Sequence, residues 1–161
     1  MQTNIRPLLR LRAALLARIV PVFAVCSLVA ASEGYASERW ATLEAIHQLE
    51  NPTNTEEPGT FGELGAYQFR EETWKMHTQA PFSRALDRHS SDAVAVKHYD
   101  WIKSELEQRG VAATPYRIAL AWNGGIKAVF EERPPAAVAD YAARAANLAA
   151  VFEKSEVADA R

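Results

Sequence analysis

Apolar residues recur at helical spacing through most of the chain, whereas the strict alternation typical of β-strands is nearly absent. The first helical stretch follows Ser37, a residue type that can cap a helix beginning at Glu38. Five positions at helical spacing share one broad face of it: Trp40, Leu43, Ile46, His47 and Glu50. We expect Asn51 and Pro52 to end this helix, because the residue before a proline disfavours helical geometry. Glu50 then occupies its last turn.

Two further helices are predicted between residues 70 and 110. One spans 70–77 with Trp74 turned inward, and the other is capped by Ser90 or Ser91 and closed by Gly110. The buried stripe of the second helix consists of four residues at helical spacing: Ala95, Tyr99, Ile102 and Leu106.

The stretch 51–69 separates these helices from the first one. It is rich in glycine, proline and short polar residues, so we expect a long ordered loop or a small hairpin. Long loops in compact domains are usually functional.

The last part of the chain shows two more helices. A threonine–proline pair at 114–115 is typical of a cap and first helical position, and a glycine pair at 124–125 ends that helix. After a short segment, two prolines at 134–135 precede an alanine-rich helix over 136–153. Its inner side is formed by Val138, Tyr141, Ala145, Leu148 and Phe152.

The N-terminal residues 1–31 are typical of an export signal. Four arginines precede an apolar stretch, 19–31, that is too short to cross a bilayer comfortably and ends in small residues. We expect cleavage after Ala31 or, alternatively, after Ala36, and export to the periplasm or the outside of the cell. Cys26 fits a lipoprotein signal poorly and is expected to be discarded with the leader. Since Cys26 is the single cysteine, the remaining chain must be held by its core alone.

Composition predicts one mainly α domain over 37–155, followed by a short tail over 156–161. The 161 residues are 48% hydrophobic and 24% charged, which leaves room for one core. A net charge of -2, without lysine runs interleaved with aromatic residues, argues against nucleic acid as a partner. The four histidines have no metal-ligand spacing, and no nucleophile triad or phosphate-binding loop is recognisable. We therefore expect a monomer that needs no metal or cofactor and inserts into no membrane once the leader is removed.

Glu50 is the candidate catalytic residue. The helix ends directly after it, so its carboxyl group should emerge from the core at the mouth of the loop. Desolvation there disfavours the charged form and raises the pKa. A carboxyl group that keeps its proton near neutral pH can serve as the general acid of a glycoside-cleaving enzyme. The alternative is a solvated glutamate in a last helical turn without a chemical role.

Four segments resemble, in order and at similar intervals, the soluble lytic transglycosylase and goose-type lysozyme-like domain family: "AIHQLENP", "GELGAYQFREETW", "ALAWNGG" and "VADYAARAANLAAVF". The resemblance covers most of the chain after the leader and implies a lysozyme-like helical fold with a cleft-lining loop. It implies that Glu50 is the catalytic glutamate. The residues implied to contact the substrate are Thr60, Gly62, Glu63, Gln68, Trp122, Asn123 and Tyr141.

The chain departs from the pattern of that family at several positions. Glu63 stands where alanine is usual, Thr60 where serine is frequent, and Trp122 where tyrosine is usual. Asn51 and Pro52 replace a serine–glycine pair. An indole can donate a hydrogen bond but not accept one, so the substrate preference should differ in detail.

Each of the implied roles has a structural alternative. The glycines of the stretch 62–69 would let the backbone approach a sugar closely, and Gln68 would offer it a donor and an acceptor. Phe69 and Trp74 are expected to be core residues. Asn123 either holds substrate or caps its helix, and Tyr141 either hydrogen bonds near Glu50 or belongs to the core.

The resemblance implies cleavage of the β-1,4 bond between N-acetylmuramic acid and N-acetylglucosamine in peptidoglycan strands. One glutamate protonates the glycosidic oxygen and then takes the proton of the sugar's own C6 hydroxyl, leaving a 1,6-anhydro end. A second carboxylate facing Glu50 would instead favour a hydrolytic muramidase or chitinase-type enzyme. Glu56 and Glu57 fit solvated loop charges better, whereas Glu63 stays open. A non-catalytic glycan-binding or envelope-assembly module on the same fold is the alternative of another class.

Overall fold

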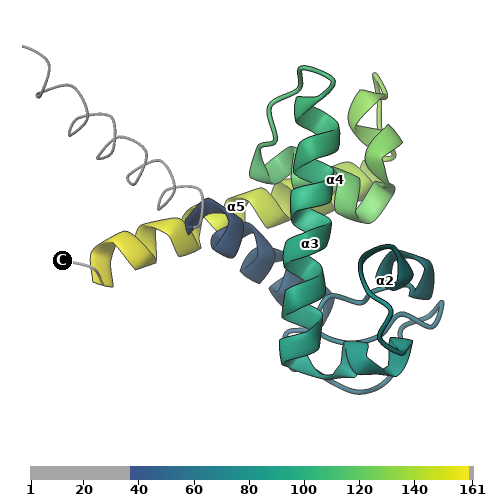
Figure 1. The fold of residues 1–161 in the computed structure, drawn as a ribbon. Coiled ribbons are helices and arrows are strands. Elements are labelled where there is room, and N and C mark those ends of the chain that lie inside the picture. The colour runs from purple at the N-terminus through teal and green to yellow at the C-terminus, as the bar shows by residue number, and fades with distance from the viewer. Residues whose placement is uncertain (1–36, 160–161) are drawn as a thin grey trace, which may run out of the picture. The chain divides into compact units, whose positions relative to one another are not determined.

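The computed structural model describes residues 37–159, and it opens on a helix over 37–50 that we call the first helix (Figure 1). Ser37 is already helical, so it does not stand outside the helix as the predicted cap. The helix ends before Asn51 and Pro52, as predicted.

The first helix packs on the last one, α5 (Ala136–Asp159). Small side chains allow the two backbones to approach closely, and the fully buried residues of this contact are Ala41, Ala45 and Ala149. The predicted apolar face is confirmed at Leu43, Ile46 and His47, which are buried. Trp40 is the exception at 45% exposed, because it lies at the edge of the contact, where its ring meets Phe152 edge-on at 6.1 Å.

The loop after the first helix is organised by the buried side chain of Asn51. Its amide nitrogen donates to the carbonyl oxygens of Thr55 (2.9 Å) and Gly65 (3.2 Å), and its oxygen accepts from the Thr55 N–H (2.9 Å). Of the predicted alternatives, the ordered loop is the better description, since its pairing is limited to an isolated antiparallel bridge between Leu64 and Phe69.

Three elements follow the loop: α2 (Glu71–His77), the 3-10 helix η1 (Phe82–Leu86) and α3 (Arg88–Glu107). Trp74 is turned inward from α2 as predicted, and its indole N–H donates to the carbonyl oxygen of Ala80. The predicted stripe of α3 is confirmed, since all four residues are fully buried: Ala95, Tyr99, Ile102 and Leu106.

The N-terminus of α3 differs from the prediction. The cap is Asp87, whose carboxylate accepts a hydrogen bond from the Ser90 N–H at 2.9 Å, and Ser90 and Ser91 lie inside the helix. A carboxylate is favoured at this position because it also interacts with the positive end of the helix dipole.

The C-terminal part contains α4 (Pro115–Gly124), η2 (Ile126–Phe130) and α5. The predicted start of α4 is confirmed, with the Thr114 side chain as cap and proline in the first turn. The predicted end is confirmed as well, since Gly125 takes a left-handed φ of 78° and redirects the chain.

Helix α5 extends six residues beyond its predicted end at 153. The residues 154–159, "KSEVAD", contain neither glycine nor proline, so nothing in them stops the helix. The α4–η2–α5 junction forms a buried cluster of Ala119, Leu120, Ala128, Ala142 and Ala145. Leu49 packs against this cluster and thereby fixes the end of the first helix against α4 and α5.

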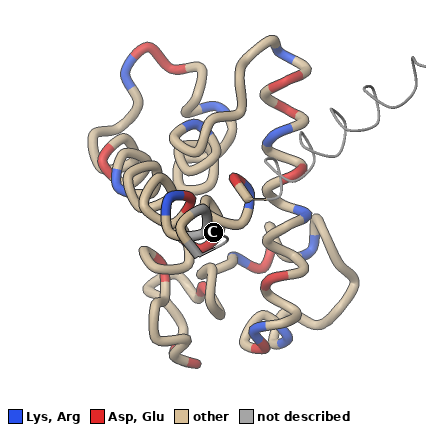
Figure 2. Tube along the Cα trace, turned by 90° about the vertical axis from the view of Figure 1, so that its left-hand side faces the viewer, with Lys and Arg blue, Asp and Glu red and all other residues tan. Residues whose placement is uncertain are grey.

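The range 37–159 contains helices and loops without a strand, so the predicted mainly α class is confirmed for it. None of the helices in this range has the length and apolarity that crossing a bilayer requires. Acidic and basic positions are interspersed along helices and loops (Figure 2). The predicted export signal, both cleavage sites and Cys26 lie outside the described residues.

Candidate active site

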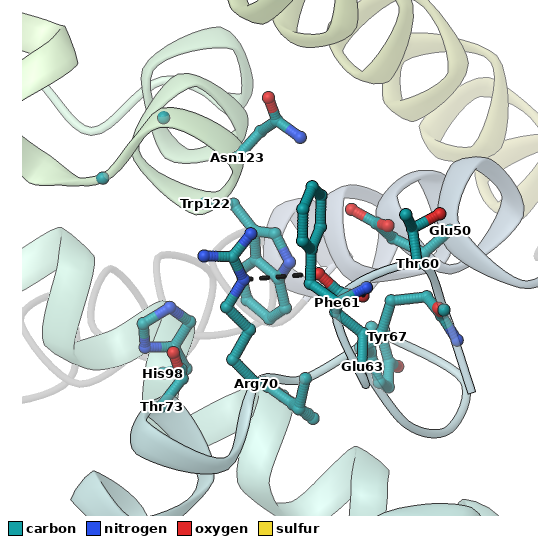
Figure 3. Close-up of a pocket in the computed structure, with 15 residues that line it drawn as sticks. Glu50, Thr60, Phe61, Glu63, Tyr67, Arg70, Thr73, His98, Trp122 and Asn123 are labelled. Carbon is teal, nitrogen blue, oxygen red and sulfur yellow. Dashed lines mark hydrogen bonds and ion pairs between the residues drawn. The ribbon is translucent and has the colours of Figure 1, made fainter.

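A cleft of about 610 Å³ opens at the C-terminal end of the first helix (Figure 3). Four parts of the chain line it: the last turn of the first helix, the loop 59–70, the adjoining faces of α2 and α3, and the end of α4. Its lining includes Glu50, Thr60, Glu63, Gln68, Trp122 and Asn123. Six of the eight residues proposed from the sequence therefore lie in one cleft.

Glu50 lies in this cleft with a half-buried side chain. Its carboxylate oxygen Oε1 accepts a hydrogen bond of 2.7 Å from the hydroxyl of Tyr141, which is 91 residues away in the sequence. Burial raises the pKa of Glu50 above its ordinary value. The Tyr141 hydrogen bond opposes this shift, and the negative charge of Glu63 adds to it. Glu50 therefore holds its proton to a higher pH than a solvated glutamate.

Tyr141 reaches the acid from α5 and is not itself part of the cleft lining. Its ring packs against the α4–η2–α5 cluster, as Leu49 also does. Burial and the neighbouring Glu50 charge raise the pKa of the Tyr141 phenol, so the hydroxyl stays protonated and remains the donor. Of the two alternatives for Tyr141, the hydrogen bond to Glu50 is the one observed, and it is compatible with core packing.

Glu63 is a second carboxylate in the same cleft, with only 13% of its side chain exposed. Its oxygen Oε2 accepts from the Phe61 N–H at 2.8 Å, and Oε1 accepts from Nε of Arg70 at 3.3 Å. Burial alone would raise the pKa of Glu63, but the backbone hydrogen bonds and the Arg70 guanidinium lower it below the ordinary value. The cleft thus contains one carboxyl group whose pKa is raised and one whose pKa is lowered.

The polar residues proposed to contact a substrate differ in whether their side chains are already hydrogen bonded within the protein. Gln68 takes a positive φ of 44°, and its side-chain nitrogen donates to the carbonyl oxygen of Gly65 at 3.1 Å, so its donor is engaged within the loop. Asn123 is exposed at the top of the cleft in Figure 3, at the last turn of α4. Thr60 is exposed and lines the same cleft.

Two of the loop glycines, Gly62 and Gly65, are not part of the cleft lining and instead meet a requirement of the backbone. Gly62 is absent from the lining; it takes a left-handed φ of 82°, and a Cβ there would meet open space. Gly65 is buried, also at a left-handed φ, and a Cβ there would overlap the carbonyl oxygen of Ala85 in η1. Close packing on η1 is therefore the reason for glycine at 65.

Aromatic rings form the inner wall of the cleft. Trp122 is half-buried and contacts Phe69, Tyr67 and His98 at ring-centroid distances of 5.6, 6.0 and 4.8 Å. Phe69 and Trp74 are buried, which confirms their predicted place in the core, although Phe69 also touches the cleft. A rigid aromatic wall of this kind offers an apolar surface to a sugar ring.

The lining residues that sequence reasoning missed include Phe61, Arg70, Thr73 and His98. His98 lies on α3, and Nε2 of His77 lies 2.9 Å from its Nδ1. Burial, with a smaller contribution from the charge of His77, lowers the pKa of His98 to about 3. His98 is therefore a neutral hydrogen-bonding group in the wall. The available sequence signal was its place about one helical turn from Ala95 and Ile102 of the buried stripe, which marks it as inward-facing only.

No protein-family model matches the chain, and neither a curated protein nor a solved structure matches it at a significant level. What the chain does is therefore inferred from the cleft itself.

Replacing Tyr141 with phenylalanine removes a hydrogen bond that stabilises the ionised form of Glu50. We expect the pKa of Glu50 to rise further in Tyr141→Phe, because burial and the charge of Glu63 then act unopposed. A ¹³C NMR titration of the side-chain carboxyl groups measures this pKa directly and needs no substrate. Tyr116→Phe, at an exposed position outside the cleft, is the matched control. An unchanged or lower pKa in Tyr141→Phe would contradict the assignment.

Proposed function

We propose that this protein is a peptidoglycan lytic transglycosylase with a lysozyme-like fold, which cleaves the β-1,4 bond between N-acetylmuramic acid and N-acetylglucosamine. The observation that carries the proposal is the half-buried Glu50, which has a raised pKa, faces a cleft and accepts a hydrogen bond from Tyr141. The export signal predicted at 1–31 would bring the protein to a substrate outside the cytoplasmic membrane.

The surroundings of Glu50 suit a glycan. The cleft volume, about 610 Å³, lies within the range of small-ligand sites and accommodates sugar rings. Trp122 supplies an apolar wall, while Thr60 and Asn123 supply hydroxyl and amide groups for sugar hydroxyls and acetamido groups.

The proposed reaction uses Glu50 twice. Its proton passes to the glycosidic oxygen as the bond from that oxygen to C1 of the muramic acid unit breaks. The resulting carboxylate then takes the proton of the C6 hydroxyl of the same sugar, and O6 bonds to C1. Glu50 regains its proton, no water is consumed, and the products are a free 4-hydroxyl and a 1,6-anhydro ring.

Glu63 favours a second candidate, a hydrolytic muramidase on the same site. It is an ionised carboxylate in the same cleft, and its charge acts on Glu50, as a two-carboxylate glycosidase requires. Transglycosylation remains our first proposal, because the hydrogen bonds from Phe61 and Arg70 lower the pKa of Glu63 and so make it a weaker base toward a water molecule.

Mass spectrometry of the fragments released from purified sacculi distinguishes the two reactions. Under our proposal the muramic acid ends are 1,6-anhydro rings, and digestion in H₂¹⁸O leaves these ends unlabelled. Free reducing ends that carry ¹⁸O would establish hydrolysis instead. If the chain starting at residue 37 releases no fragment from sacculi of several compositions, both enzymatic proposals fail.

A further inference from the structure

Phe61 is a large apolar side chain displayed in the cleft. It is 77% exposed at the tip of the turn that ends at Gly62, whose N–H donates to the carbonyl oxygen of Gly59 at 3.0 Å. The Phe61 N–H donates to Glu63, and the Glu63 carbonyl oxygen accepts from the Gly59 N–H at 2.8 Å. The backbone of this turn is therefore held from both sides while the ring faces solvent. Its place in the cleft makes this exposed ring available to a ligand bound there.

Arg70 stands beside this ring. Its guanidinium carbon lies 5.3 Å from the centroid of the Phe61 ring, and its side chain is 61% exposed. Within the described residues, Nε is the guanidinium nitrogen that is hydrogen bonded, at 3.3 Å from Glu63, which leaves the two terminal nitrogens for a ligand. Arg70 is also the single lysine or arginine among the described residues that line the cleft.

Figure 3 shows how these groups lie relative to the acid. Glu50 and Thr60 lie at one end of the residues drawn, Thr73 and His98 lie at the other, and Phe61 and Arg70 lie between them. A sugar chain that places its scissile bond at Glu50 therefore extends past Phe61 and Arg70. Glu63 links both residues to one carboxylate, so that it positions the pair.

We propose that Phe61 and Arg70 form a subsite for an acidic glycan unit, with Phe61 against the apolar face of a sugar ring and Arg70 paired with a carboxylate that the substrate carries. This inference rests on the proposed glycan cleavage and adds a preference to it. A guanidinium suits the role because its parallel N–H groups match the two oxygens of a carboxylate.

The subsite distinguishes peptidoglycan from neutral chitin. A chitin oligomer offers no negative group to the two terminal guanidinium nitrogens of Arg70, so Arg70 would keep Glu63 as its charged partner and gain none from the ligand. N-acetylmuramic acid carries a carboxylate on its lactyl ether, and when a peptide is attached there, the peptide carries carboxylates of its own. Both sources present a carboxylate on the muramic acid unit. Ligands with and without the peptide distinguish the lactyl carboxylate from the peptide carboxylates.

The test measures binding by calorimetry in the Glu50→Gln background, so that no ligand is cleaved. The three ligands are chitotetraose, a peptide-free tetrasaccharide of alternating N-acetylglucosamine and N-acetylmuramic acid, and the same tetrasaccharide with its peptides. Adding Arg70→Gln should weaken binding of the carboxylate-bearing ligands about five- to tenfold at low salt and leave chitotetraose binding unchanged. If only the peptide-free tetrasaccharide loses affinity, the lactyl carboxylate is the partner of Arg70. If only the peptide-bearing tetrasaccharide loses affinity, a peptide carboxylate is the partner.

Two matched variants isolate the effect. Lys75→Gln removes the same charge from α2 outside the cleft, where Lys75 pairs with Glu71, and should change none of the three affinities. Phe61→Ala should weaken all three ligands alike, since it removes apolar contact rather than charge. Equal effects of Arg70→Gln on neutral and acidic glycans, or none, would overturn the subsite while the proposed function stands. Failure of all three ligands to bind the Glu50→Gln protein would overturn both proposals.

Discussion

Glu50→Gln is expected to lower the rate of glycan cleavage by roughly 10²–10⁴-fold, the range that general acid catalysis contributes. Glutamine keeps the size of the side chain and can still accept the Tyr141 hydrogen bond, but it has no proton to give to the glycosidic oxygen. Release of soluble fragments from purified sacculi, followed over time, measures the loss.

Glu57→Gln is the matched control, because Glu57 is an exposed loop glutamate outside the cleft lining, and it should keep full activity. A Glu50→Gln protein as active as its parent would remove Glu50 from the mechanism. If the parent binds cell wall but cleaves nothing, and Glu50→Gln binds equally well, the protein is a glycan-binding module instead.

The same variant also has a stability signature. The folded state raises the pKa of Glu50, so above the ordinary value of 4.5 the folded protein retains a proton that the unfolded chain releases. The free energy of unfolding that Glu50 contributes therefore falls as pH rises through this window. Glutamine does not titrate, so the stability of Glu50→Gln relative to its parent should increase from about pH 4 to about pH 7 in denaturant titrations. A constant difference would contradict a raised pKa.

Gly65→Ala is expected to lower the free energy of unfolding by roughly 2–4 kcal/mol, the size of effect that overpacking and backbone strain produce. Its Cβ would overlap the carbonyl oxygen of Ala85, and its φ of 78° disfavours any L side chain. Both Asn51 and Gln68 donate to the Gly65 carbonyl oxygen, so a shift there also disturbs the loop around Glu50. Thermal and denaturant unfolding measure the loss.

Gly110→Ala separates the two causes. Gly110 has a similar φ of 71°, but a Cβ there would meet open space, so the variant should lose only about 1 kcal/mol from the left-handed backbone. If Gly65→Ala is no less stable than Gly110→Ala, the contact with Ala85 does not constrain the loop. Activity of Gly65→Ala should fall along with its stability, since the loop lines the cleft.

Helical periodicity predicted most of the fold, because the buried stripe on α3 repeats at the spacing of a helix. On α5, Ala145 is buried as predicted, the other four predicted positions are partly buried, and Ala142 and Ala149 are buried beside them.

Helical periodicity predicted the helix boundaries less well, because several neighbouring residues can cap the same helix. Asp87 caps α3 in place of Ser90 or Ser91, since three residues able to cap lie within five positions and only the fold selects among them. At the other end, α5 continues to Asp159, because a helix can outlast its apolar periodicity when no helix-breaking residue follows.

The candidate site was predictable where a residue stands at a helix end or in the loop, as Glu50, Glu63 and Asn123 do. Thr73 and His98 were not, because their place in the cleft depends on how α2 and α3 pack beside the loop. Phe61 and Arg70 were not, because the folded turn 59–62 and the hydrogen bonds to Glu63 bring them together. Gly65 shows the limit of interpreting a glycine from sequence: the need for a small residue was real, but it comes from η1 rather than from a sugar.

The hydrogen bond between Tyr141 and Glu50 joins the two ends of the domain. A chain that stops before α5, during synthesis or after proteolysis, has the acid but lacks both its partner and the helix on which the first one packs. Catalytic competence would then be acquired only when the last segment docks. If the protein is the lytic transglycosylase that we propose, this order of events protects the wall of the cell producing it from premature cleavage.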